Sequence, residues 1–145
     1  MIRPGTYVLA LTLDSDLETE VGRLGRLCFR RGRYCYVGSA ENGLDQRIGR
    51  HLSCEKKVRW HIDRLTLAAG SMQAYESHVP ECGLARAVEE AGGVPVADGF
   101  GCSDCKCRTH LFLLDYEAEA ALASDGRLSP HAPCRSQASG ATQPL

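Results

Sequence analysis

The alternation of apolar and polar positions predicts a small β-sheet near the start of the chain. Residues 6–13 are apolar at almost every position, which is typical of a central strand with both faces covered. Residues 14–25 are polar, acidic and interrupted by glycine, and they predict a loop or an irregular excursion. Residues 26–30 and 33–38 flank a glycine-containing turn, and this pattern predicts a hairpin whose second strand leads into a helix.

Helical periodicity follows directly after that hairpin. Leu44, Ile48 and Leu52 recur at every fourth residue, so a helix that begins near Asn42 would bury one apolar stripe. The same reasoning predicts further helices at 60–67, 80–91 and 116–123, and further strands at 71–78 and 109–114. We therefore expect an α/β (α+β) fold in which a small antiparallel or mixed sheet is flanked by helices, with an extra hairpin and a cysteine-rich loop.

Composition sets the limits of this fold. The 145 residues suffice for one domain, which we place at 1–124. Residues 125–145 contain few large apolar side chains, and we expect a disordered tail there. The first apolar run is too short for a secretory signal, and no stretch reaches the length of a membrane span. Eight cysteines are too few for a disulfide scaffold, so we expect a cytoplasmic protein with reduced or metal-bound thiols and no membrane partner.

The charged residues are unevenly distributed. Between Arg23 and Arg64 there are 11 Lys/Arg and 4 Asp/Glu, a net charge of +7, whereas the rest of the chain has a net charge of −8. A strongly basic section is expected where a protein meets a polyanion such as a nucleic acid. A solvated charged face is the alternative explanation of the same pattern.

The candidate chemistry lies in the same basic section. Tyr36 stands near the end of a predicted strand, the small residues 38–40 break that strand, and Arg47 and His51 lie four residues apart on the helix that follows. A tyrosine, a tight backbone turn and an Arg/His pair would together surround a phosphodiester. Each residue type also has an ordinary structural explanation, since strand tyrosines usually pack and a helix histidine can be satisfied by water.

Several short motifs, taken in order, resemble the GIY-YIG nuclease domain. They are Gly5-Thr6-Tyr7 on the first strand, Tyr36-Val37-Gly38 on a later strand, Arg47-Ile-Gly-Arg-His51 on the following helix, and a helix that begins with Glu81. The wider pattern is similar to a small prokaryotic branch formerly called DUF123, some of whose members are attached to an endonuclease III type glycosylase. The matching runs are Lys56-Lys57, Trp60-His61-Ile62-Asp63 and Gly-Phe-Gly-x-Ser-Asp-Cys-x-Cys.

This resemblance implies a metal-dependent endonuclease that hydrolyses phosphodiester bonds, with DNA favoured over RNA and a role of the repair or recombination kind. The implied catalytic residues are Tyr7, Tyr36, Arg47, His51 and Glu81. A tyrosine would orient the attacking water, Arg47 would bind the scissile phosphate, and Glu81 would hold one Mg²⁺ or Mn²⁺ ion. The residues implied to contact nucleic acid are Gly38, Ser39, Arg50, Lys56, Lys57 and His61. A glycosylase or another repair protein is the implied partner.

Departures from the family pattern leave other interpretations open. The middle residue of the first motif is Thr6 rather than isoleucine, and Glu76, Glu89 and Glu90 compete with Glu81 as the metal ligand. The alternative function is a non-catalytic nucleic-acid-binding module that keeps the basic surface. A third interpretation is a regulatory protein built on the cysteine-rich loop.

That loop has its own candidate chemistry. Cys102, Cys105, Cys107 and His110 place four possible zinc ligands within nine residues, and Cys82 is a candidate to replace one of them. One short loop rarely supplies all four ligands of a structural zinc site. Reduced thiols that shape the loop, and redox chemistry, are therefore the alternatives.

Overall fold

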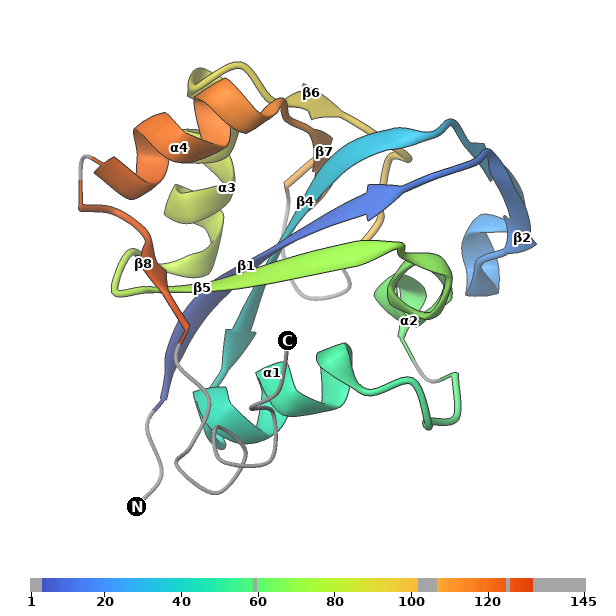
Figure 1. Cartoon of the computed structure of the whole chain (residues 1–145), viewed down its shortest axis with the longest axis horizontal. Coiled ribbons are helices and arrows are strands. Elements are labelled where there is room, and N and C mark those ends of the chain that lie inside the picture. Colours follow the sequence, from blue (N-terminus) through green and yellow to red (C-terminus); the bar gives the residue numbers. More distant parts are fainter. Residues whose placement is uncertain (1–3, 59, 102–106, 125, 132–145) are drawn as a thin grey trace, which may run out of the picture.

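The computed structural model of the chain describes residues 4–58, 60–101, 107–124 and 126–131. Within these residues, a six-stranded antiparallel sheet has the order β6-β7-β4-β1-β5-β8 (Figure 1). Its strands are β1 (Gly5–Leu13), β4 (Gly32–Ala40), β5 (Ser71–Ser77), β6 (Val94–Pro95), β7 (Leu111–Leu113) and β8 (Ser129–Pro130). The helices of the described chain are α1 (Leu44–Leu52), α2 (His61–Ala68), α3 (Glu81–Glu90) and α4 (Tyr116–Ser124). The predicted α+β fold is confirmed.

Helices cover both faces of the sheet because β1 is apolar on both of its sides. Tyr7, Leu9 and Leu11 point to the face where α1 and α2 pack, whereas Val8 and Ala10 point to the face where α3 and α4 pack (Figure 1). All five side chains are buried, and β1 pairs with β4 on one side and with β5 on the other. The prediction of a central strand is therefore confirmed.

The structure differs from the prediction between β1 and β4. A strand β2 (Leu17–Glu20) pairs with β3 (Arg26–Phe29) in a separate two-stranded ribbon, the 3-10 turn η1 (Gly22–Leu24) joins them, and β4 pairs with β1. The predicted hairpin turn at Arg31-Gly32 is therefore wrong, and the extra hairpin of the predicted fold is formed by β2 and β3 instead. Residues 14–25, predicted as a loop or an irregular excursion, contain β2 and η1. A two-stranded ribbon buries little surface, so β2 is half polar and its pattern is typical of a loop. The nine-residue strands β1 and β4 bury more apolar surface by pairing with each other.

The two helices under the first face begin close to the predicted positions. α1 starts after Gly43, whose φ of 127° is rarely adopted by other residues. α2 starts after Trp60, whose backbone N donates a hydrogen bond of 2.9 Å to Asp63 Oδ2. This carboxylate satisfies an exposed amide at the helix start. The start of α1 is thus marked by a glycine conformation, and the start of α2 by a local hydrogen bond.

The segment after α4 differs from the predicted disordered tail. Leu128 is buried, residues 129–130 pair with β5, and His131 N donates a hydrogen bond of 2.9 Å to Ala74 O. One apolar anchor and a short strand pairing hold residues 126–131 against the sheet. Residues 132–145, where the rest of the predicted tail falls, lie outside the described residues. No helix in the described part of the chain combines the length and apolar character that crossing a bilayer requires.

Candidate functional site

Tyr7 and Tyr36 lie on neighbouring strands, on the face that α1 covers. Their ring centroids are 6.4 Å apart. Gly38 stands opposite Tyr7 in the β1–β4 register, and a Cβ placed on it would lie 2.4 Å from the Tyr7 hydroxyl oxygen. Only glycine leaves room for the tyrosine side chain here. Gly38, which was predicted to contact nucleic acid, is therefore buried against Tyr7.

His51 on α1 joins the two tyrosines. The Tyr7 hydroxyl and His51 Nε2 are 2.8 Å apart, and the centroids of the His51 and Tyr36 rings are 6.2 Å apart. Tyr7 and His51 are each 1% exposed. Burial raises the pKa of Tyr7 to about 12 and lowers the pKa of His51 to about 3. At neutral pH the phenol is protonated and the imidazole is neutral, so one neutral hydrogen bond joins the two side chains.

Arg47 lies one helical turn before His51 and next to open space. Its Nη1 donates a hydrogen bond of 3.0 Å to Ser39 O, and its Cζ lies 4.6 Å from the centroid of the Trp60 ring. Arg47 also acts on Tyr7. Its positive charge and a hydrogen-bonding contact lower the pKa of the phenol, whereas burial raises it by more. Among the described residues it forms no ion pair with a carboxylate. Two hollows of about 210 and 270 Å³ border its side chain, so its charge is available to an incoming phosphate.

Three other predicted nucleic-acid contacts have partners within the fold. Arg50 forms hydrogen bonds of 2.9 and 3.0 Å to the buried carboxylate of Asp63. Lys56 Nζ donates to two carbonyl oxygens in the last turn of α1, over 2.7 and 3.1 Å. His61 Nδ1 accepts a backbone hydrogen bond of 3.4 Å. Lys57 is the exposed member of this predicted group, and it is the one best placed to meet a polyanion.

Glu81, the first residue of α3, reaches the end of β4. Its Oε1 accepts a hydrogen bond of 2.9 Å from Ser39 Oγ, and its Oε2 lies 3.0 Å from His110 Nδ1. The close contact with His110, the hydrogen bond from Ser39 and the charge of Arg47 together lower the pKa of Glu81, against the opposing effect of burial. Ser39 therefore binds the carboxylate through its hydroxyl and the guanidinium through its carbonyl. Ser39 thus links Glu81 to Arg47, and the two charged side chains do not pair directly.

The site surrounds the end of β4 instead of filling a single pocket. Gly38 faces the α1 layer and Ser39 faces the α3 layer, because alternate residues of a strand point to opposite sides. Hydrogen bonds between β4 and the β7 segment extend only as far as Val37. Within the described chain, Glu81 and Arg47 approach the remaining end of β4 from its two sides. The other predicted catalytic residues gather on the Arg47 side.

Glu81 offers the kind of ligand that Mg²⁺ or Mn²⁺ requires. One carboxylate combined with water and phosphate oxygens is a common ligand set for Mg²⁺, and this side chain is 31% exposed. Among the competing carboxylates, Glu76 Oε2 lies 2.6 Å from His131 Nδ1, while Glu89 and Glu90 are exposed at the other end of α3. The donor set at Glu81 therefore fits a hard divalent cation.

Thiols gather beside the start of the same helix. Cys82 Sγ, Cys107 Sγ and a ring nitrogen of His110 all lie within 4.8 Å of one another. Cys102 and Cys105, the other predicted zinc ligands, lie outside the described residues. The cluster thus contains two of the predicted ligands and the cysteine that was proposed as a replacement.

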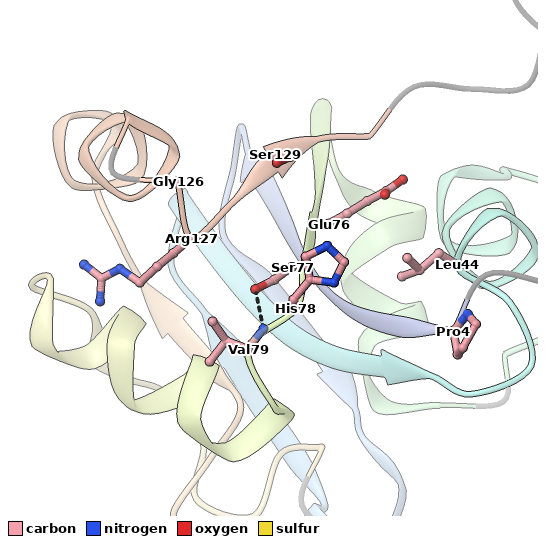
Figure 2. Close-up of a pocket in the computed structure, with 9 residues that line it drawn as sticks. All are labelled: Pro4, Leu44, Glu76, Ser77, His78, Val79, Gly126, Arg127 and Ser129. Carbon is pink, nitrogen blue, oxygen red and sulfur yellow. Dashed lines mark hydrogen bonds between the residues drawn. The ribbon is translucent and has the colours of Figure 1, made fainter.

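A larger cavity of about 580 Å³ lies beside β5 and β8, near the start of α1 (Figure 2). Its lining includes Glu76, His78 and Arg127, which are its ionisable side chains. Glu76, one of the carboxylates that compete with Glu81, lines it, whereas none of the five implied catalytic residues does. Cavity size alone would therefore point away from the cluster of tyrosines, histidine and arginine.

Three residues that complete the site were not assigned to it from the sequence. His110 contacts Glu81, Trp60 lies beneath Arg47, and buried Asp63 holds Arg50. The Trp60-His61-Ile62-Asp63 run did carry a signal, because an acidic third residue is typical of a helix cap. The contact between His110 and Glu81 had no local signal, since it joins two segments distant in the sequence.

Comparison with known proteins gives a family and no close relative. A family model described as "Domain of unknown function DUF123" matches residues 6–127. No curated protein and no solved structure matches significantly. The matched range contains every predicted site residue, from the first tyrosine to the last histidine.

Proposed function

Since the chain belongs to the DUF123 family, whose function is unknown, we propose an activity from the geometry of the site. We propose that the protein is a metal-dependent endonuclease of the GIY-YIG type that hydrolyses phosphodiester bonds in DNA. The observation that carries this proposal is the position of Arg47. Its guanidinium is held by the Ser39 carbonyl and the Trp60 ring, has no carboxylate partner among the described residues, and borders open hollows.

In this proposal Arg47 binds the scissile phosphate and stabilises the charge that develops on its oxygens. A planar guanidinium matches the geometry of a phosphate, and a donor that is fixed in advance needs no reorganisation during the reaction. The hydrogen bond to Ser39 O and the contact with Trp60 restrict the guanidinium in this way. The basic section from residue 23 to residue 64, with a net charge of +7, attracts the DNA backbone.

The two tyrosines have different roles in this proposal. Tyr36 is only half-buried and orients the attacking water, whereas Tyr7 is buried and stays protonated because burial raises its pKa to about 12. Tyr7 and His51 share a hydrogen bond, and in this proposal His51 is a positioning residue for the phenol. Neutral His51 keeps positive charge out of the buried layer beneath Arg47.

Glu81 is the residue that would hold Mg²⁺ or Mn²⁺. A bound ion supplies positive charge beside the reacting phosphate and lowers the pKa of a bound water. The lowered pKa of Glu81 keeps this carboxylate ionised, so it can act as a ligand at neutral and mildly acidic pH.

Cleavage assays with matched variants test the proposal. Branched, flapped and nicked DNA would be incubated with the full chain and Mg²⁺ or Mn²⁺. Arg47→Ala and Glu81→Gln are each expected to lower the cleavage rate by about 100- to 1000-fold. Arg64→Ala and Glu90→Gln change exposed residues of the same types and should leave the rate nearly unchanged. Cleavage that survives both site variants at the wild-type rate would reject the site.

A nucleic-acid-binding module without turnover is the second candidate. It is favoured by one observation, namely that both carboxylate oxygens of Glu81 already have protein partners. This candidate predicts DNA binding that weakens steeply with salt and no cleavage with any divalent ion. Fluorescence anisotropy of labelled DNA, measured with the cleavage assay on the same samples, distinguishes the two functions.

A further inference from the structure

Two cysteines and a histidine meet beside the proposed metal-binding carboxylate and take no part in the chemistry above. Cys82 lies in the first turn of α3, whereas Cys107 and His110 lie on the segment that leads into β7. Their donor atoms all lie within 4.8 Å of one another. His110 is 1% exposed, and the two cysteines are half-buried. Residues that are well separated in the sequence therefore present three metal-binding atoms at one place.

This set of donors matches zinc. In a tetrahedral site, Zn–S bonds of about 2.3 Å place two thiolate sulfurs about 3.8 Å apart, so the three side chains need only small movements to bind one ion. Thiolate and imidazole are softer donors than the oxygen ligands that Mg²⁺ prefers. We propose that Cys82, Cys107 and His110 bind one zinc ion, and that the two thiol protons are released on binding.

The surroundings supply the other features that a zinc site needs. A cavity of about 170 Å³ is lined by both cysteines, with Pro95 and Phe112 in its apolar wall, and it gives the ion a route from solvent. His110 Nδ1 lies 3.0 Å from Glu81 Oε2. Imidazole has two nitrogens, so zinc bound at Nε2 would leave Nδ1 in contact with the carboxylate, an arrangement that metal-binding histidines commonly adopt. The described residues supply three protein ligands, and a tetrahedral zinc ion takes one further donor beside them.

The ion would join the start of α3 to the segment before β7. Cys82 directly follows Glu81, and His110 contacts Glu81. Zinc bound by these two residues would therefore restrict the movement of the Glu81 carboxylate. A fixed Glu81 in turn keeps its hydrogen bond to Ser39 at the end of β4. The zinc site does not depend on the proposed cleavage, because zinc content is measurable whether or not the protein cuts DNA.

Zinc stoichiometry in cysteine variants tests the proposal. The purified full chain would be stripped with a chelator, reloaded with Zn²⁺, dialysed and subjected to elemental analysis. About one zinc ion per chain is expected in the wild type. Cys82→Ser and Cys107→Ser should each weaken zinc binding at least about tenfold. Cys28→Ser and Cys54→Ser change exposed thiols outside the cluster and should keep the full zinc content.

Two further measurements keep the test decisive if a variant folds poorly. Reloading the wild type with Co²⁺ should produce a thiolate-to-metal charge-transfer band, and Zn²⁺ should raise the Tm of the stripped wild type. His110→Asn should lose the Tm increase. Absence of stoichiometric zinc in the reloaded wild type overturns the proposal. Zinc retained by both Cys82→Ser and Cys107→Ser, or a disulfide between these two cysteines in the purified protein, also overturns it.

Discussion

Arg33 and Arg47 lie on opposite faces of the same sheet and have opposite surroundings. Arg33 forms two hydrogen bonds, of 2.9 and 3.0 Å, to both carboxylate oxygens of Glu119, and the two side chains are 10% and 5% exposed. Arg47 instead binds a backbone carbonyl and borders open hollows. Each guanidinium also lies over an aromatic ring, Tyr116 in the first case and Trp60 in the second.

The difference shows how similar side chains serve stability on one face and binding on the other. A buried Arg–Glu pair uses up both charges, and Tyr75 adds a third hydrogen-bonding group to Glu119. On the Arg47 side, Ser39 stands between the guanidinium and the carboxylate of Glu81, so neither charge neutralises the other through direct contact. Separation by one serine keeps an anion-binding group and a cation-binding group close together.

The largest expected effect on stability comes from breaking the ion pair between Arg33 and Glu119. Glu119→Gln leaves the buried Arg33 without its charge partner and should lower the free energy of unfolding by about 3–5 kcal/mol. Glu81→Gln removes a partly exposed carboxylate and should cost about 1 kcal/mol. Urea denaturation of both variants measures the contrast. Equal losses in the two variants would show that the Glu81 side is also a stability cluster.

The buried histidine should make the Arg47 face sensitive to acid. Burial lowers the pKa of His51 from 6.5 to about 3, so between these values the unfolded chain binds a proton that the folded chain excludes. The stabilising contribution of neutral His51 is complete above pH 6.5 and is lost as the pH falls toward 3. From pH 6.5 to about pH 4.5 the loss should be about 2–3 kcal/mol. His51→Gln should reduce this slope and exposed His78→Gln should not; the same slope in both variants would contradict the assignment.

Two glycine-to-alanine substitutions, one at Gly38 and one at Gly49, test the close approach of Tyr7 to β4. Gly38→Ala should lower the free energy of unfolding by about 1–3 kcal/mol, because the new Cβ would lie 2.4 Å from the Tyr7 hydroxyl oxygen. Gly49→Ala, inside α1 with open space around it, should raise that free energy by about 0.5–1 kcal/mol. Thermal unfolding measures both. A neutral Gly38→Ala would mean that the tyrosine moves aside easily.

The smallest effect separates two neighbouring lysines. Lys57→Ala removes an exposed cation and should reduce the slope of log K against log salt concentration for DNA binding by about 0.9, with little change in stability. Lys56→Ala removes the hydrogen bonds to the end of α1 and should act mainly on stability. Salt titrations of DNA binding, together with urea denaturation, measure both outcomes. A larger slope change in the Lys56 variant would reverse the assignment.

Periodic apolar patterns were enough to predict β1, α1 and the α+β fold. The stripe of Leu44 and Ile48 and the two apolar faces of β1 are strong local signals. The β2–β3 ribbon could not be predicted in this way, because its half-polar strands bury little surface. The short segment around Leu128 was missed for a similar reason, since one apolar residue makes no period.

The candidate site was predictable as a set of residues and less so as a set of contacts. Motif order named Tyr7, Tyr36 and Arg47, and the structure brings them together. It could not show that Arg50 and Lys56 bind within the fold, because their partners depend on how α1 and α2 pack. The sequence shows how many cationic residues there are, whereas their hydrogen-bond partners in the fold decide which of them can still bind a phosphate.

The chain contains a single tryptophan, and both Arg47 and Arg50 lie over its ring, with Cζ atoms 4.6 and 4.2 Å from the centroid. Trp60 is therefore a built-in fluorophore, and all tryptophan emission of the chain comes from beside Arg47. A ligand that draws Arg47 away from the indole would change the emission intensity and wavelength, whereas Arg50, bound to Asp63, would stay in place. Occupancy of the site can thus be followed by light in the unlabelled protein.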